Sequence, residues 1–232
     1  MTDFTVIAFD PGGTTGWAAM TVDEACLLGT CPHHSTHGDS LDACVAVGNW
    51  EWGQIDAANL GSTRAGETMG YGHDAMNLIG ENETVNWMLW KCNNELPNAA
   101  VALEKFVLDP RAASGKFDLL SPVRIISAFS FGMWAAEVDM PGNHRRFQLI
   151  NRGDPKRTCT NERMKRWGFK AVVTHNTRHA LDASRIAFYF LRDCVGNSEK
   201  AREKRWRAWP QHFPDPEVRA KPVRKPNLGE RI

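Results

Sequence analysis

Residues 4–17 read Phe-Thr-Val-Ile-Ala-Phe-Asp-Pro-Gly-Gly-Thr-Thr-Gly-Trp, and this stretch decides the fold. Its first six residues form a short, mostly apolar run of strand-preferring types, which predicts a buried strand. The run ends at Asp10, and a carboxylate seldom closes a buried strand without a partner. Pro11, Gly12 and Gly13 then predict a tight turn, and the alternation beyond it predicts an antiparallel second strand. Asp10 therefore lies at a sheet edge suited to fixing a metal ion or a phosphate. The alternative is that Asp10 only closes the turn, since Asp-Pro-Gly is ordinary turn chemistry.

The composition favours one intracellular α/β domain with an extension. The chain has 232 residues, 42% of them hydrophobic, which is enough for a sizeable core. Its net charge of +1 means that any DNA-binding surface must be local. No run approaches the roughly 18 apolar residues of a membrane span, and Met1-Thr-Asp is not a basic signal-peptide start. We therefore expect no membrane contact and a cytoplasmic location.

The six cysteines form no Cys-x-x-Cys pair, which favours a reduced protein. A second possible metal site is a zinc site within residues 26–37, from Cys26, Cys31, His33, His34 and His37. Their spacing fits no standard zinc pattern, so a polar loop is the expected structure.

The pattern after the first hairpin predicts a mixed α/β sheet. We expect a loop at 29–43, a strand at 44–55, a loop at 56–70 and a helix at about 74–95 that Gly80 weakens. A buried strand at 99–103 then stops at Glu104. A helix capped by Ser121-Pro122 is expected next, with a buried side made of Val123, Ile126, Phe129, Ser130 and Met133. It is followed by a strand at 147–150 and a loop that carries Arg152, Lys156 and Arg157. The last expected elements are a short helix at 161–167 and a helix from 176 or 177 to about 194.

The last of these helices carries two polar residues on an apolar face. His179 and Asp182 step at three- and four-residue intervals into the stripe of Ala183, Ile186 and Phe190. A polar pair in line with a core stripe, at the N-terminal end of a helix, is expected to face the rim of the sheet. Chance placement is the alternative.

Asp10, Glu104 and Asp182, together with His179, each lie at the end of an element beside a buried segment. Three carboxylates gathered at one sheet edge would repel one another unless cations lie among them. Hard oxygen ligands suit Mg²⁺ or Mn²⁺, and a pair of such ions promotes phosphodiester hydrolysis. His179 could ligate the second ion or carry a proton.

Three motifs resemble the RuvC family of Holliday-junction resolvases, which belongs to the ribonuclease H-like superfamily. They are the Ile-Ala-Phe-Asp-Pro-Gly hairpin, the Val-Ala-Leu-Glu strand and the Arg-His-Ala-x-Asp-Ala helix. The resemblance spans about residues 4–195 and looks like the divergent, phage-encoded branch, in which case the expected location is the host cytoplasm. The insertion at 29–43, the 108–118 loop and the long tail depart from the family pattern.

The resemblance implies an α/β fold with a five-stranded mixed sheet, three antiparallel N-terminal strands plus parallel strands, flanked by helices. It also implies a homodimer that resolves four-way junctions and other branched DNA, with two Mg²⁺ ions per site, Mn²⁺ as a substitute and no small-molecule cofactor. Catalytic and metal-binding roles fall on Asp10, Glu104, His179 and Asp182. Phe106 is the aromatic candidate near the crossover, and the basic candidates for DNA contact are Arg111, Lys116, Arg152, Lys156 and Arg157.

Two other functions compete with this interpretation. Residues 10–15 also look like the first phosphate loop of actin-like ATPases and sugar kinases, but the second Gly-rich loop of those proteins has no counterpart here. A non-catalytic DNA-binding protein is the third possibility, and it leaves the placement of the acids unexplained. Within the nuclease class, a hydrolase of RNA–DNA hybrids is a further alternative.

The predicted division of the chain is a ribonuclease H-like nuclease domain at 1–196 and a basic, Pro-rich C-terminal extension at 197–232. The extension holds ten Lys and Arg residues against five acids, with Trp206, Trp209 and Phe213 interleaved. It either binds nucleic acid or packs its aromatic residues on the domain.

Overall fold

The computed structural model describes residues 2–32, 49–57, 73–106, 120–139, 147–166 and 178–215. Within these ranges, only the backbone is described at 73–77 and 137–139.

A single five-stranded sheet forms the centre of the described part of the chain. Its strands are β1 (Asp3–Asp10), β2 (Thr14–Asp23), β3 (Asn49–Asp56), β4 (Ala100–Lys105) and β5 (Phe147–Asn151), in the order β3-β2-β1-β4-β5. β1 pairs antiparallel with β2, and β2 antiparallel with β3, whereas β4 runs parallel to both β1 and β5. Three antiparallel strands joined to two parallel ones in this order make a ribonuclease H-like sheet. The predicted fold class is confirmed.

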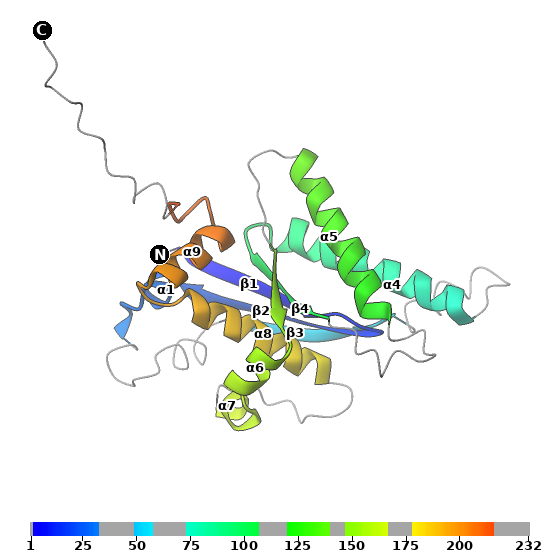
Figure 1. Ribbon diagram of the computed structural model, residues 1–232, viewed down its shortest axis with the longest axis horizontal. Coiled ribbons are helices and arrows are strands. Elements are labelled where there is room, and N and C mark those ends of the chain that lie inside the picture. The colour runs from blue at the N-terminus through cyan, green and yellow to red at the C-terminus, as the bar shows by residue number, and fades with distance from the viewer. Residues whose placement is uncertain are drawn as a thin grey trace, which may run out of the picture.

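Helices cover both faces of this sheet. They are α1 (Glu24–Leu28), α4 (His73–Trp90) with its π-helical continuation η2 (Lys91–Glu95), α5 (Ser121–Asp139), α6 (Gly153–Thr158), α7 (Asn161–Arg166), α8 (Arg178–Cys194) and α9 (Glu199–Ala208). Figure 1 shows α4 and α5 on one side of the sheet and α8 with α6 on the other.

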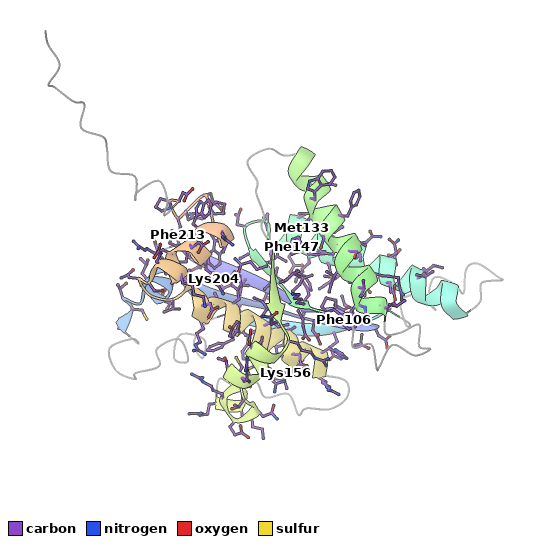
Figure 2. All side chains as sticks on the ribbon, in the orientation of Figure 1. Phe106, Met133, Phe147, Lys156, Lys204 and Phe213 are labelled. Carbon is purple, nitrogen blue, oxygen red and sulfur yellow. The ribbon has the colours of Figure 1, made fainter. Side chains whose placement is uncertain are left out.

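The alternation of side chains along β1 builds a core on each face. Phe4, Val6 and Ala8 belong to the cluster that includes the apolar stripe of α8. Ile7 and Phe9 belong to the opposite cluster, with α4 and α5. Figure 2 shows Met133 of α5 and Phe147 of β5, both members of this second cluster, close together between α5 and the sheet. β1 is therefore the buried central strand that its composition predicted.

Two local predictions were wrong. Residues 153–158, expected in a loop, form α6, where Asp154 and Pro155 stand in the first turn, the positions at which helices tolerate them best. In α5, Ile125 is fully buried whereas Val123 is 41% exposed, so the inward face is rotated from the expected one, although Phe129 and Met133 are buried as predicted.

Gly80 has a packing role that the pattern did not reveal. A Cβ at this position would lie 1.7 Å from the carbonyl oxygen of Ala57, so only glycine lets α4 pass this close to the end of β3. The glycine that weakens the helix on propensity grounds is thus the residue that allows it to dock.

The start of the predicted C-terminal extension packs on the domain. Ser198 caps α9, and Trp209, 1% exposed, joins the core cluster on the α8 face, where its ring meets Phe4 edge-on at 5.2 Å between centroids. Arg205, 2% exposed, donates to the carbonyl oxygens of Cys194 and Gly196 at the end of α8. Of the two alternatives for this segment, packing of its aromatic residues is found as far as Phe213. The division of the chain at residue 196 stays a prediction.

Several predictions fall outside the described residues. They concern most of the loops at 29–43 and 56–70, the start of the strand expected from residue 44, Arg111, Lys116, the cap at 176 or 177 and the tail beyond 215. In the part of the chain that the structure describes, no helix is long and apolar enough to span a membrane.

Candidate functional site

Two neighbouring strands deliver a carboxylate each to the same corner of the sheet. Phe9 of β1 pairs with Leu103 of β4, and Asp10 and Glu104 are the next residues along these parallel strands. Because side chains alternate along a strand, Asp10 is on the same face as Ala8, and Glu104 is on the same face as Ala102. Ala8 and Ala102 belong to the core cluster on the α8 face. Register and alternation together therefore aim the two acids at the N-terminal end of α8.

A third strand positions that helix end. The Oε1 atom of Gln54 in β3 accepts hydrogen bonds from the backbone nitrogens of His179, at 2.8 Å, and Ala180, at 3.1 Å. The first N–H groups of a helix have no partner within it, so Gln54 satisfies two of them from another element. Between Gln54 and Asp10 in the register lies Gly16, where a Cβ would be only 2.0 Å from the carbonyl group of His179. The glycine lets α8 rest directly on β2.

His179 is joined to Asp10 across 169 residues of sequence. Its Nδ1 atom lies 2.7 Å from Oδ2 of Asp10 in a hydrogen bond. This hydrogen bond raises the pKa of His179, and burial opposes the rise. The Asp10 side chain is 12% exposed and that of His179 39%, so the pair joins a buried carboxylate to a reachable imidazole.

Asp10, Glu104, His179 and Asp182 all line one pocket of about 250 Å³. Its other lining residues are Pro11, Gly12, Phe106, Pro122, Arg152 and Arg178. Acids far apart along the chain thus share a single cavity.

Burial and the neighbouring Asp10 both act on the pKa of Glu104. Burial, together with the charge of Asp10 and a hydrogen bond to it, raises the pKa of Glu104 to about 8. Lys156 and Arg152 act in the opposite direction, and the Nε atom of Arg152 lies 3.2 Å from a Glu104 oxygen.

Asp182 is held by two basic side chains. Lys156 of α6 places its Nζ atom 2.8 Å from Oδ2, and Arg185, one helical turn further along α8, places Nη1 2.5 Å from Oδ1. The Asp182 side chain is only 8% exposed, so the two cations compensate a charge that would otherwise be buried and unpaired. Figure 2 shows Lys156 on the α8 side of the sheet.

The donor set of the pocket fits a hard divalent cation. Its three carboxylates are oxygen ligands of the kind that Mg²⁺ and Mn²⁺ prefer. Among the described residues, no three His, Cys, Asp or Glu side chains are already drawn together as a metal-binding group. Two of the acids are ion-paired instead: Asp182 with Lys156 and Arg185, and Glu104 with Arg152.

Four of the six residues predicted to contact DNA lie in the part of the chain that the structure describes. Phe106 and Arg152 line the pocket, Lys156 pairs with Asp182, and Arg157 is 80% exposed beside Asp154. Arg111 and Lys116 lie outside the described residues.

Sequence reasoning missed several residues that build the site: Gly16, Gln54, Arg178 and Arg185. Arg178 carried an available signal, since it directly precedes His179 in the late helix. Arg185 carried one too, because it follows Asp182 by three residues, a spacing at which helical side chains can pair. Gly16 and Gln54 act through contacts between elements, which leave no periodic pattern.

In the alternative zinc cluster, Cys26 and Cys31 are buried in the core on the α8 face. His33, His34 and His37 lie outside the described residues.

The fold and the pocket define an α/β protein of ribonuclease H-like architecture with an acidic cavity where β1, β4 and α8 meet. No protein-family model matches the sequence, and no curated protein matches it. Two solved structures of RuvC from Thermus thermophilus are similar to the chain, one of them in complex with a Holliday junction substrate. In each case the identity is 12%, with 82% of this chain and 94% of that chain covered, and the TM-scores are 0.45 for the complex and 0.47 for the other structure. The fold is assigned from the strand order and directions given above.

Proposed function

We propose that this protein is a metal-dependent endonuclease that resolves Holliday junctions and other branched DNA by two-metal phosphodiester hydrolysis. The observation that carries the proposal is the meeting of Asp10, Glu104 and Asp182, with His179, in one pocket. Burying a carboxylate is costly, and the fold supplies a basic partner to each of the three in one cavity, which is best explained by a functional demand.

The residues proposed to hold Mg²⁺, or Mn²⁺ in its place, are Asp10, Glu104, His179 and Asp182. When bound, two such ions would supply an activated water and stabilise the charge on the leaving oxygen. Asp10 lies between two of the other proposed ligands, because it contacts both His179 and Glu104.

The chain's own side chains prepare the pocket for a phosphodiester. Asp10 keeps the His179 ring in a fixed orientation through Nδ1, which leaves the other ring nitrogen free to bind or to move a proton. Arg152, whose side chain is 66% exposed, and Arg178 stand at the border of the pocket as positive charges for a DNA backbone. Phe106 is proposed to stack on a base beside the cut.

Basic side chains of α6 extend this proposed DNA surface. Arg157 is 80% exposed and Lys156 is 33% exposed. A local basic border suits the chain's net charge of +1, which supplies no general attraction for DNA.

Symmetric cutting of a four-way junction requires two active sites, and α5 offers a surface on which two copies could meet. Phe131 and Trp134 are 67% and 59% exposed, and their rings lie 5.8 Å apart between centroids. Val123, 41% exposed, extends the same helix face, and Leu120, 47% exposed, lies directly before the helix. Exposed apolar groups of this size are typical of interfaces, so we propose a homodimer that uses α5.

The proposal is tested by incubating the protein and its Asp10→Asn variant with a synthetic four-way junction, linear duplex, RNA–DNA hybrid and ATP, each with and without Mg²⁺. We expect Mg²⁺-dependent cutting of the junction that Asp10→Asn abolishes. Asp3→Asn is the matched control, because Asp3 lies exposed at the other end of the same strand, and it should cut like the wild type.

Other outcomes would decide against the proposal. Turnover of ATP without any DNA cutting would favour the kinase-like alternative. Junction binding that leaves the DNA intact at every metal concentration would indicate a non-catalytic binding protein. Preferential cutting of the hybrid would keep the nuclease chemistry and change the substrate.

A further inference from the structure

We propose that Arg185 is a positioning residue that presents the Asp182 carboxylate to the metal. The inference rests on the proposed function, because it assumes that the pocket binds a divalent cation.

Arg185 is tied to three groups at once. Its Nη1 atom donates to Oδ1 of Asp182 at 2.5 Å, and its Nε atom donates to the carbonyl oxygen of Cys159 at 3.0 Å. Its Nη2 atom donates to the side chain of Asn161. The planar guanidinium fits these acceptors in a single orientation, so the position of Oδ1 is defined by the connection between α6 and α7.

Burial makes this arrangement rigid. The Arg185 side chain is 13% exposed, and Cys159, whose carbonyl accepts from it, is fully buried. The Sγ atom of Cys159 lies 3.7 Å from the carbonyl oxygen of Arg185, so the two residues are joined through both backbone and side chain. Arg185 thus anchors α8 to the segment after α6 beside the candidate ligand.

Lys156 differs from Arg185 in each of these respects. It holds the other oxygen of Asp182, its ammonium has free rotation about a flexible stem, and its side chain is 33% exposed. An incoming cation can therefore displace Lys156 from Oδ2 while Arg185 remains on Oδ1. The structure assigns opposite roles to the two basic residues: Lys156 competes with the metal, and Arg185 orients its ligand.

Charge and orientation predict opposite effects of mutating Arg185, and this makes the inference testable. A positive charge beside the site repels a metal ion, so its removal alone would tighten metal binding. Loss of the orienting hydrogen bonds would weaken it, and outer-sphere partners of metal ligands are typically worth about 10–100-fold in affinity.

The experiment is a titration of the full-length protein with Mn²⁺ alone, followed by the electron paramagnetic resonance of the free ion. We expect Arg185→Lys, which keeps the charge and loses the planar fork, to bind Mn²⁺ about 10-fold more weakly than the wild type. Arg185→Gln should also bind more weakly, although it removes a positive charge. Lys156→Gln should bind more tightly. Arg192→Lys, an exposed exchange on the same helix, is the control and should leave the affinity unchanged.

Asn161→Ala gives a second test if the Arg185 variants do not fold. It removes the acceptor of Nη2 and leaves Arg185 in place, and we expect a smaller weakening of Mn²⁺ binding. Circular dichroism of every variant establishes that the fold is kept.

The outcomes separate the inference from the proposed function. If the wild type binds Mn²⁺ and Arg185→Lys binds it equally well, or if Arg185→Gln binds it more tightly, the positioning role is overturned and the nuclease proposal stands. If the wild type does not bind Mn²⁺, or if Asp10→Asn binds it as tightly as the wild type, both the positioning role and the nuclease proposal are overturned.

Discussion

Gly16 and His179 touch through their backbones, although 163 residues separate them in the sequence. A Cβ at Gly16 would lie 2.0 Å from both the carbonyl carbon and the carbonyl oxygen of His179. Since Gly16 also pairs with Asp10 in the hairpin, this contact sets how close α8 comes to the first carboxylate.

The contact predicts that Gly16→Ala displaces the start of α8. A backbone neighbour cannot move aside as a flexible side chain can, so we expect a loss of about 1–3 kcal/mol in the free energy of unfolding together with loss of cleavage. Gly13→Ala is the matched control in the same hairpin, because a Cβ there meets nothing within 4 Å. Urea unfolding and junction cleavage measure the two effects, and equal behaviour of the two variants would contradict the prediction.

Gln54 should contribute to stability through the N-terminus of α8. Its Oε1 atom accepts from the backbone nitrogens of His179 and Ala180, so Gln54→Ala leaves two partly buried donors without this acceptor. We expect a cost of about 1–2 kcal/mol, as for the loss of a helix cap. Gln54→Glu keeps an acceptor and places a negative charge at a helix N-terminus, so it should be more stable than Gln54→Ala in thermal unfolding. If Gln54→Ala is as stable as the wild type, Gln54 does not stabilise the protein by capping α8.

Cys194 should make the protein less stable at alkaline pH. Burial raises the pKa of the Cys194 thiol from its ordinary value of 9.0 to about 12. Below pH 9 the thiol is neutral in both states; between pH 9 and 12 it ionises only in the unfolded chain, so the free energy of unfolding falls as pH rises. The Cys194 contribution is at most about 1.4 kcal/mol per pH unit. Urea unfolding at pH 8 and pH 10.5 should show a smaller loss for Cys194→Ala than for the wild type, and identical losses would contradict this assignment.

The exposed face of α5 should hold two copies of the chain together. Replacing both Phe131 and Trp134 by glutamate places two charges on that face, and we expect the variant to sediment as a monomer while the wild type sediments as a dimer. Leu149→Glu is the control, because Leu149 is 47% exposed on the edge strand β5. Sedimentation velocity distinguishes the species. A wild type that is monomeric at high concentration, or a variant that stays dimeric, would exclude α5 as the interface.

Much of the fold could be predicted because apolar periodicity reports burial directly. β1 is buried on both faces, and its continuous apolar run indicated this. The stripe of α8 predicted the side on which Asp182 lies, and Asp182 is 6% exposed within it. The same apolar runs placed Asp10 and Glu104 at the ends of buried strands, whereas the face that they share with Ala8 and Ala102, toward α8, is seen only in the structure.

Predictions of the buried helix face and of short helices failed where the sequence allows two structures of similar preference. In α5 both Val123 and Ile125 are apolar, and the sequence offers two possible inward faces. Packing selected the one with Ile125, and left Phe131 and Trp134 outside. The basic stretch after β5 was expected as a loop because Gly, Asp and Pro follow one another there, yet the same residues are acceptable in the first turn of a helix.

By itself, the sequence determined that β1 and the apolar stripe of α8 are buried and which acids stand at the ends of buried elements, because these properties follow from the local order of apolar and polar side chains. Only the tertiary structure decided which groups meet across elements: Gly16 under His179, Gln54 on the start of α8, Arg185 on the carbonyl oxygen of Cys159, and Lys156 on Asp182. Such contacts join elements that are distant along the chain, and their geometry depends on how whole helices pack on the sheet, which no local pattern encodes.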